Sequence, residues 1–147
     1  MDPIFKQVPI FAGMDDASLE FIAQHSKEHV FPAHEVIVRE GEQGHQIFII
    51  AKGSVRVVKN YCSINELDLA VLNDTDFFGE ICLFYTAHRT ATVEANIETR
   101  AFTIRPLAFH SLGQKMPQQY AILLLNIARD MARRLRNIDE VYAATHG

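Results

Sequence analysis

The chain has 147 residues, 48% hydrophobic and 22% charged, the balance of one globular domain rather than of a disordered chain. Fourteen lysines and arginines against 18 aspartates and glutamates give a net charge of −4, which argues against DNA or RNA as main partner, because nucleic-acid binding draws on a basic excess. No apolar run approaches the ~18 residues of a membrane span, and no secretory signal opens the chain, so we expect a cytoplasmic protein.

The start of the chain is predicted to be helical and its middle to be β. Asp15 or Asp16 can cap a helix over residues 15–26, whose apolar face includes Leu19 and Ile22. Residues 28–105 then show strand-sized runs separated by turns, with no long helix between them. This pattern predicts a mainly β fold with flanking helices, an antiparallel jelly-roll β-barrel rather than a parallel sheet. The expected strands cover residues 36–39, 47–51, 54–58, 67–72, 90–95 and 100–104.

The end of the chain is predicted to be helical over residues 106–142. Pro106 lies in the first turn of a short helix, and Pro117 opens a long one. Apolar residues along the long helix recur at alternating steps of four and three, a seam of about two and a half heptads. This seam can pack on the chain's own barrel or form a homodimer interface, and the pattern leaves both open. Its members are Leu124, Ala128, Met131, Leu135, Ile138 and Tyr142.

The residues from Gly79 to Arg89 carry the strongest chemical signal. A strand is expected to end at Gly79, where a ligand can approach the backbone closely, and a short helical segment to follow from Glu80. The first N–H groups of such a segment lack partners and can bind an anion. Arg89 offers a planar guanidinium for a phosphate, and Glu80 an acceptor for ribose hydroxyls. A surface ion pair between Glu80 and Arg89 is the alternative interpretation.

The same stretch resembles the phosphate-binding cassette of cyclic-nucleotide-binding domains, here over residues 78–92. Phe78-Gly79-Glu80-Ile81-Cys82-Leu83 and Arg89-Thr90-Ala91 are similar to the family pattern Phe-Gly-Glu-(Leu/Ile)-x-Leu, a short spacer and Arg-(Ala/Ser/Thr)-Ala. The glycine-marked segments 40–44 and 47–57 and the early segment 11–14 also resemble the family. Its members include catabolite activator proteins, protein kinase A regulatory subunits and hyperpolarisation-activated channels.

The resemblance implies roles for individual residues. Arg89 and the N–H groups of Cys82 and Thr90 would hold the cyclic phosphate, while Glu80 would accept from the ribose 2′-hydroxyl beside Gly79. The Thr90 hydroxyl can favour cGMP in this family but also occurs in domains that respond to cAMP, and we expect cAMP in preference. The terminal helix would be a lid over the base. The expected base contacts and pocket walls are Ile81, Leu83, Val55, Val57, Leu72, Thr90, Arg134, Asn137 and Ile138, with Val55 and Leu72 favoured as core.

We therefore expect a single cyclic-nucleotide-binding domain over residues 1–147 that acts as a ligand-gated switch and is not an enzyme. It would use no cofactor and no metal. Its ligand would be the cyclic nucleotide. Its protein partner would be either a second copy, bound through the C-terminal helix, or an unidentified effector protein. This chain by itself would bind neither nucleic acid nor a membrane. Since the sequence ends soon after the lid helix, two interpretations stay open: a stand-alone sensor and a part of a longer protein.

Two alternatives come from other classes of protein. A cupin-like metal enzyme can share this kind of barrel, but the seven histidines are scattered and show no His-x-His with a following glutamate. An interaction domain that has lost ligand binding is the second alternative, and the presence of both Glu80 and Arg89 argues against it. Cys62 and Cys82 are expected to be reduced thiols.

Overall fold

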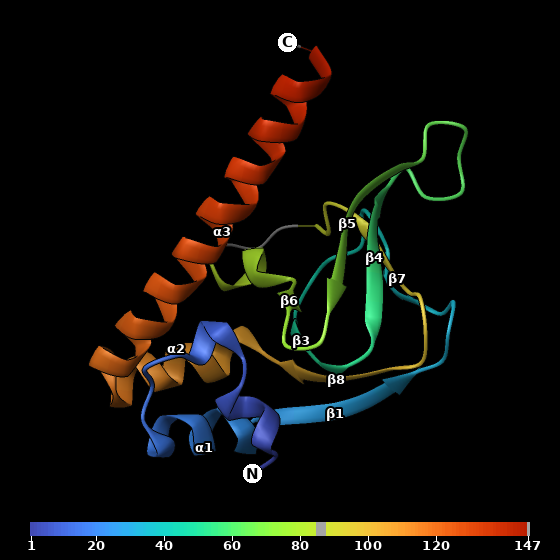
Figure 1. The fold of residues 1–147 in the computed structure, drawn as a ribbon. Coiled ribbons are helices and arrows are strands. Elements are labelled where there is room, and N and C mark those ends of the chain that lie inside the picture. Colours follow the sequence, from blue (N-terminus) through green and yellow to red (C-terminus); the bar gives the residue numbers. More distant parts are fainter. Residues whose placement is uncertain (85–87, 147) are drawn as a thin grey trace.

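The computed structural model describes residues 1–84 and 88–146, and its strands form two four-stranded antiparallel sheets (Figure 1). One sheet has the strand order β1-β8-β3-β6 and the other the order β2-β7-β4-β5. This arrangement confirms the mainly β, antiparallel jelly-roll prediction. The strands are β1 (Ser26–Phe31), β2 (Val36–Val38), β3 (Ile47–Lys52), β4 (Ser54–Lys59), β5 (Leu67–Asn73), β6 (Phe77–Phe78), β7 (Thr92–Ala95) and β8 (Thr99–Ile104).

Helices flank the sheets at both ends of the chain. The short 3-10 helices η1 (Pro3–Lys6) and η2 (Pro9–Phe11) precede α1 (Asp16–Gln24), η3 (Glu80–Leu83) follows β6, and α2 (Pro106–Lys115) and α3 (Pro117–His146) follow the barrel. The carboxylate of Asp15 accepts the N–H of Ser18 at 2.8 Å, so Asp15 rather than Asp16 caps α1. α1 ends earlier than the expected residue 26 because Ser26 already pairs with Ile104 of β8.

Two hydrophobic clusters form the core. The larger one joins the sheet of β1, β8 and β3 to the helices and includes Phe5, Ile22, Ile49, Phe109 and Leu112. The smaller one lies between the two sheets and consists of Phe48, Ile50, Val55, Leu72, Phe78 and Val93. Val55 is fully buried there, in line with its expected place in the core.

α3 packs on the hydrophobic core along its first half. Leu123 and Ile127 are buried in the larger cluster, and the amide of Asn126 donates to the carbonyls of Ile10 and Ala12 at 2.9 and 2.8 Å. Figure 1 shows the C-terminal half of the helix extending away from the barrel. In the seam, Leu124 and Met131 pack on the larger cluster, whereas Leu135, Ile138 and Tyr142 are more than half exposed.

Of the helices that the structure describes, none combines the length and the apolar character needed to cross a bilayer.

Candidate functional site

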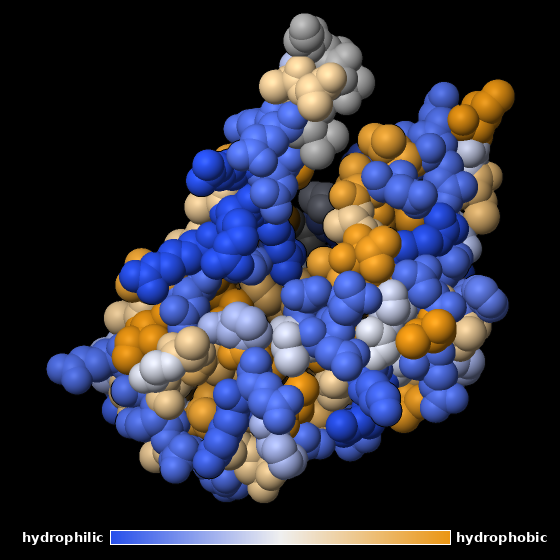
Figure 2. Space-filling view, in the orientation of Figure 1, coloured by the Kyte–Doolittle hydropathy of each residue, from blue (hydrophilic) through white to orange (hydrophobic). Residues whose placement is uncertain are grey.

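A cavity of about 670 Å³ opens between the barrel and α3, a size in the range of small-molecule sites. Figure 2 shows its opening as a hollow between the hydrophilic outer side of α3 and a group of hydrophobic residues on the opposite wall. The end of β6, η3, strands β4 and β5, and the C-terminal half of α3 all contribute to its lining. The structure thus brings together Gly79, Glu80, Ile81, Cys82, Arg89, Thr90, Val57, Arg134, Asn137 and Ile138 around one space.

Gly79 forms the turn between β6 and η3, and only glycine fits there. Its φ of 84° lies in the left-handed region, where a side chain is strained. A Cβ at this position would also lie 2.5 Å from Nη1 of Arg89 and 2.8 Å from the carbonyl oxygen of Gln46. The glycine therefore permits both the backbone turn and the close approach of the arginine.

The guanidinium of Arg89 is half-buried and held from several sides. Its Nη2 donates to the carbonyl of Gln46 at 2.9 Å, and its Cζ lies 5.7 Å from the ring centroid of Phe48. The backbone N–H of Arg89 donates to the carbonyl of Glu42 at 2.6 Å. Burial lowers the pKa of the guanidinium, which nevertheless stays protonated at any physiological pH.

This cation has no carboxylate partner among residues 1–84 and 88–146: none of the ion pairs there involves Arg89. The alternative of a simple surface pair between Glu80 and Arg89 is therefore not what the structure shows. A positive charge that is half removed from water and faces a cavity is suited to bind an anion there.

The other cassette residues surround the same corner of the cavity. Glu80 begins η3, and its half-buried side chain lines the space. The thiol of Cys82 donates to the carbonyl of Gly79 at 3.0 Å. Burial raises the pKa of this thiol, so it stays neutral and does not repel an anion. The Thr90 carbonyl accepts from Nζ of Lys59 at 2.8 Å, which places a further cation beside the cassette.

Leu83, expected in the pocket wall, lies elsewhere. Its side chain is only 4% exposed and belongs to the larger hydrophobic cluster, on the side of η3 away from the cavity. The reason is the tight 3-10 turn, in which Ile81 and Cys82 face the cavity while Leu83 packs inward. Leu83 thus supports the cassette from behind. The expected helical segment up to residue 85 ends at Leu83, and residues 85–87 of the cassette lie outside the described residues.

α3 contributes three of the expected residues to the cavity: Arg134, which bonds to β6, and Asn137 and Ile138, which line the cavity. Nη2 of Arg134 donates to the carbonyl of Phe77 at 3.1 Å, its Cζ lies 4.6 Å from the Phe77 ring centroid, and its Nε lies 2.7 Å from a carboxylate oxygen of Asp130. Arg134 therefore ties α3 to β6, directly before Gly79. Asn137 and Ile138 line the cavity one turn further along, in the helical register that the sequence predicts.

The wall of the cavity that β5 forms was not predicted from the sequence. Four consecutive residues of β5, Leu67 to Ala70, line it, together with His88 and Tyr142. The alternation over residues 67–72 predicts a strand, but no residue in it indicates which face meets a ligand. Leu72 both packs in the smaller cluster and lines the cavity.

Neither cysteine forms a disulfide. Across the described ranges 1–84 and 88–146, no three histidine, cysteine, aspartate or glutamate side chains are grouped so that they could hold a metal ion.

Comparison with known proteins identifies relatives. The family model "Cyclic nucleotide-binding domain" matches residues 28–116. The cAMP-activated global transcriptional regulator CRP of Salmonella typhimurium is 32% identical over 126 residues, 85% of this chain and 58% of that protein. The cAMP-dependent protein kinase regulatory subunit of Schizosaccharomyces pombe is 29% identical over 111 residues, 76% of this chain and 26% of that protein. The chain thus spans less than two thirds of the length of each of these relatives.

Among solved structures, a cyclic nucleotide-binding domain from Methylobacillus flagellatus matches 98% of this chain and 82% of its own, with a TM-score of 0.84 at 19% identity. At that identity the likeness concerns the fold.

Proposed function

The chain belongs to the cyclic nucleotide-binding domain family, and we propose that it is a sensor for a cyclic mononucleotide, cAMP in preference to cGMP, that acts as a ligand-gated regulatory switch. One observation carries this proposal: the half-buried guanidinium of Arg89 lies at a cavity beside Gly79, with no carboxylate paired to it in the part of the chain that the structure describes. A monoanionic cyclic phosphate is the group that this corner would take.

In the proposed complex the phosphate lies against the cassette. Nη1 of Arg89 points toward Gly79 while Nη2 is held by Gln46, so the guanidinium is oriented before the ligand arrives. The backbone N–H groups of Cys82 and Thr90 would add donors, and the carboxylate of Glu80 would accept from the ribose 2′-hydroxyl. A hydrogen bond to a charged group contributes about 1.5–3 kcal/mol, so a small number of such contacts is enough for specific binding.

The base would then extend toward Val57, β5 and α3, which make up the rest of the cavity lining. The amide of Asn137 can donate and accept together, and this matches the amino group and ring nitrogen at the edge of adenine. Closure of the C-terminal half of α3 over the base would supply the switch. The ligand drives that closure only through contacts that it makes better in the closed state than in the open one.

The output of the switch would pass through α3. The exposed seam residues Leu135 and Ile138 favour a second copy of the chain as partner, with an effector protein as the alternative. The relatives above are regulators rather than enzymes by their names. By analogy we propose no catalysis, no cofactor beyond the regulatory nucleotide, no nucleic acid bound by these residues themselves, and a cytoplasmic location.

A thermal-unfolding screen with cAMP, cGMP, cyclic dinucleotides and 5′-AMP tests the proposal. A ligand at 100 times its dissociation constant adds about 2.7 kcal/mol to the free energy of unfolding. We expect the largest shift with cAMP, a smaller one with cGMP and none with 5′-AMP, whose dianionic open phosphate does not match the site. If no cyclic nucleotide raises the melting temperature, the domain is one that has lost ligand binding.

A further inference from the structure

The β5 wall of the cavity is a strand with support on one side only. β5 lies at the edge of its sheet, in the order β2-β7-β4-β5, and its strand pairing is with β4 alone. The side chains of Leu67 and Leu69 are at least half exposed, so packing contributes little to holding this end of the strand. Leu67 to Ala70 nevertheless form a continuous part of the cavity lining. Beyond the backbone pairing with β4, the position of this wall therefore depends on side-chain contacts outside the core.

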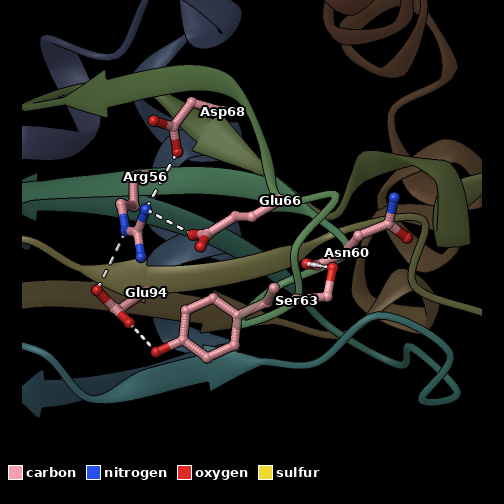
Figure 3. A network of polar contacts seen from close by, with 7 residues as sticks. Arg56, Asn60, Ser63, Glu66, Asp68 and Glu94 are labelled. Carbon is pink, nitrogen blue, oxygen red and sulfur yellow. Dashed lines mark hydrogen bonds and ion pairs between the residues drawn. The ribbon is translucent and has the colours of Figure 1, made fainter.

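The side chain of Arg56, on the central strand β4, makes that connection (Figure 3). Its Nη1 lies 3.1 Å from Oδ1 of Asp68 on β5 and 3.0 Å from Oε1 of Glu66 in the loop between β4 and β5. Its Nε lies 3.2 Å from Oε1 of Glu94 on β7, the strand on the other side of β4. One guanidinium thus spans three adjacent strands and the hairpin loop.

The network is protected from water around Arg56 and Glu94, while Asp68 at its β5 end is 71% exposed. The side chains of Arg56 and Glu94 are 28% and 11% exposed. The hydroxyl of Tyr61 donates to the second carboxylate oxygen of Glu94, and the guanidinium lies 5.6 Å from the Tyr61 ring centroid. Networks of several partly buried charges are the case in which ion pairs contribute measurably to stability.

Asp68 links this network to the ligand cavity, because it is held by Arg56 and also lines the cavity. In the proposed function, the phosphate and ribose occupy the corner of Arg89 and Glu80, so the base is the part of the ligand that meets β5. We propose that Arg56 is a positioning residue for base recognition: it fixes β5 as a wall of the cavity without touching the ligand. This inference rests on the proposed function.

The experiment compares two ligands in four proteins. The ligands are cAMP and methyl riboside 3′,5′-cyclic phosphate, which keeps the cyclic phosphate and the 2′-hydroxyl but has no base. The proteins are wild type, Arg56→Met, Arg56→Lys and the control Arg100→Met. Arg100 is 34% exposed and bonds two carboxylates, Asp2 and Glu28, at 2.9 and 3.5 Å, but on the outer side of the other sheet. Affinities are measured by competition, and amide hydrogen exchange follows residues 67–70.

We expect Arg56→Met to weaken the binding of cAMP by about tenfold, which is the size of coupling usual for residues in one network. The binding of methyl riboside 3′,5′-cyclic phosphate should weaken by less than about twofold. Exchange at residues 67–70 becomes faster, and Arg56→Lys restores part of the affinity through its single ammonium contact. Arg100→Met leaves both affinities unchanged. Equal weakening of both ligands, unchanged cAMP affinity, or unchanged exchange at β5 would each overturn the inference. If wild type binds neither ligand, the proposed function is wrong. Faster exchange at β5 in Arg56→Met would then still show that Arg56 holds β5 in place.

Discussion

Gly79 and Arg89 are fitted to each other, since a single added carbon on the glycine would lie 2.5 Å from Nη1 of the arginine. The guanidinium reaches its place because the turn after β6 has no side chain. The Gln46 carbonyl that holds Nη2 would also lie only 2.8 Å from that carbon, so the conflict involves backbone as well as a movable side chain. The cassette glycine therefore shapes the proposed anion site and does more than allow a turn.

The first prediction follows from this fit. Gly79→Ala should lower the free energy of unfolding by about 1–2 kcal/mol through its left-handed φ, and should abolish detectable binding of cAMP because Arg89 is displaced. Gly13→Ala is the matched control. Its φ of 83° is nearly the same, but an added Cβ would only make an ordinary 3.8 Å contact with Ile122. The control should lose similar stability and keep its affinity, as measured by urea unfolding and calorimetry. Equal affinities for the two variants would contradict the fit described above.

A second prediction concerns the charge of Arg89. Arg89→Ala should weaken cAMP binding by at least about tenfold, because a charge-assisted contact of about 1.5–3 kcal/mol is lost. Without ligand the variant should be about as stable as wild type, since burial of this guanidinium carries a desolvation cost that also lowers its pKa. Arg89→Lys should recover only part of the affinity, because an ammonium cannot make two parallel bonds.

Isothermal titration calorimetry and thermal unfolding of the same samples separate the two effects. Arg129→Ala, an exposed arginine on α3 that does not line the cavity, is the control and should behave as wild type. An Arg89→Ala variant that binds cAMP with wild-type affinity would refute the assignment of the phosphate site.

These residues also show how far sequence reasoning reaches. The apolar run of β3 and the alternation of β4 are local patterns, so both strands were predicted nearly to the residue. β1 was not, because Ser26 to His29 are polar or charged and become a strand only by pairing with β8. β6 confirms the strand that was expected to end at Gly79, although its two residues are too few to show a period.

The site was predictable where it is contiguous in sequence and not where it is assembled by folding. Gly79, Glu80 and Arg89 follow one another along a short segment, and their residue types and spacing carry the chemistry. Leu83 was placed in the wall because a motif does not show which way a 3-10 turn directs each side chain. The Arg56 network joins Glu66, Asp68 and Glu94 across three strands, and no local pattern marks it.

A third prediction concerns the dependence of stability on pH. The hydrogen bond from Tyr61 and then the Arg56 guanidinium hold the pKa of Glu94 below its ordinary value of 4.5. A carboxylate with a depressed folded-state pKa contributes stability above its unfolded-state pKa and loses it as the pH falls through the folded-state pKa. Glu94→Gln should therefore cost roughly 1–3 kcal/mol at neutral pH and progressively less below about pH 4.

Urea unfolding of wild type and Glu94→Gln between neutral and acidic pH measures this convergence. Glu98→Gln serves as control, because Glu98 is exposed on the loop between β7 and β8 and should change stability little at any pH. A stability difference between wild type and Glu94→Gln that stays constant with pH would show that Glu94 acts by packing rather than by its charge.

The last prediction tests whether the seam of α3 binds a second copy. Leu124 and Met131 of the seam pack partly buried on the chain itself, whereas Leu135 is 60% exposed and can meet another helix. Leu135→Asn should shift wild-type dimers toward monomers in analytical ultracentrifugation at about micromolar concentration. Leu125→Asn replaces an equally apolar exposed residue that lies outside the seam, and should leave the association unchanged. α3 also borders the ligand cavity. If its closure serves both binding and dimerisation, cAMP must change the dimerisation constant by the same factor by which dimerisation changes the affinity for cAMP. A wild-type chain that stays monomeric with and without cAMP would assign the exposed half of the seam to an effector protein instead.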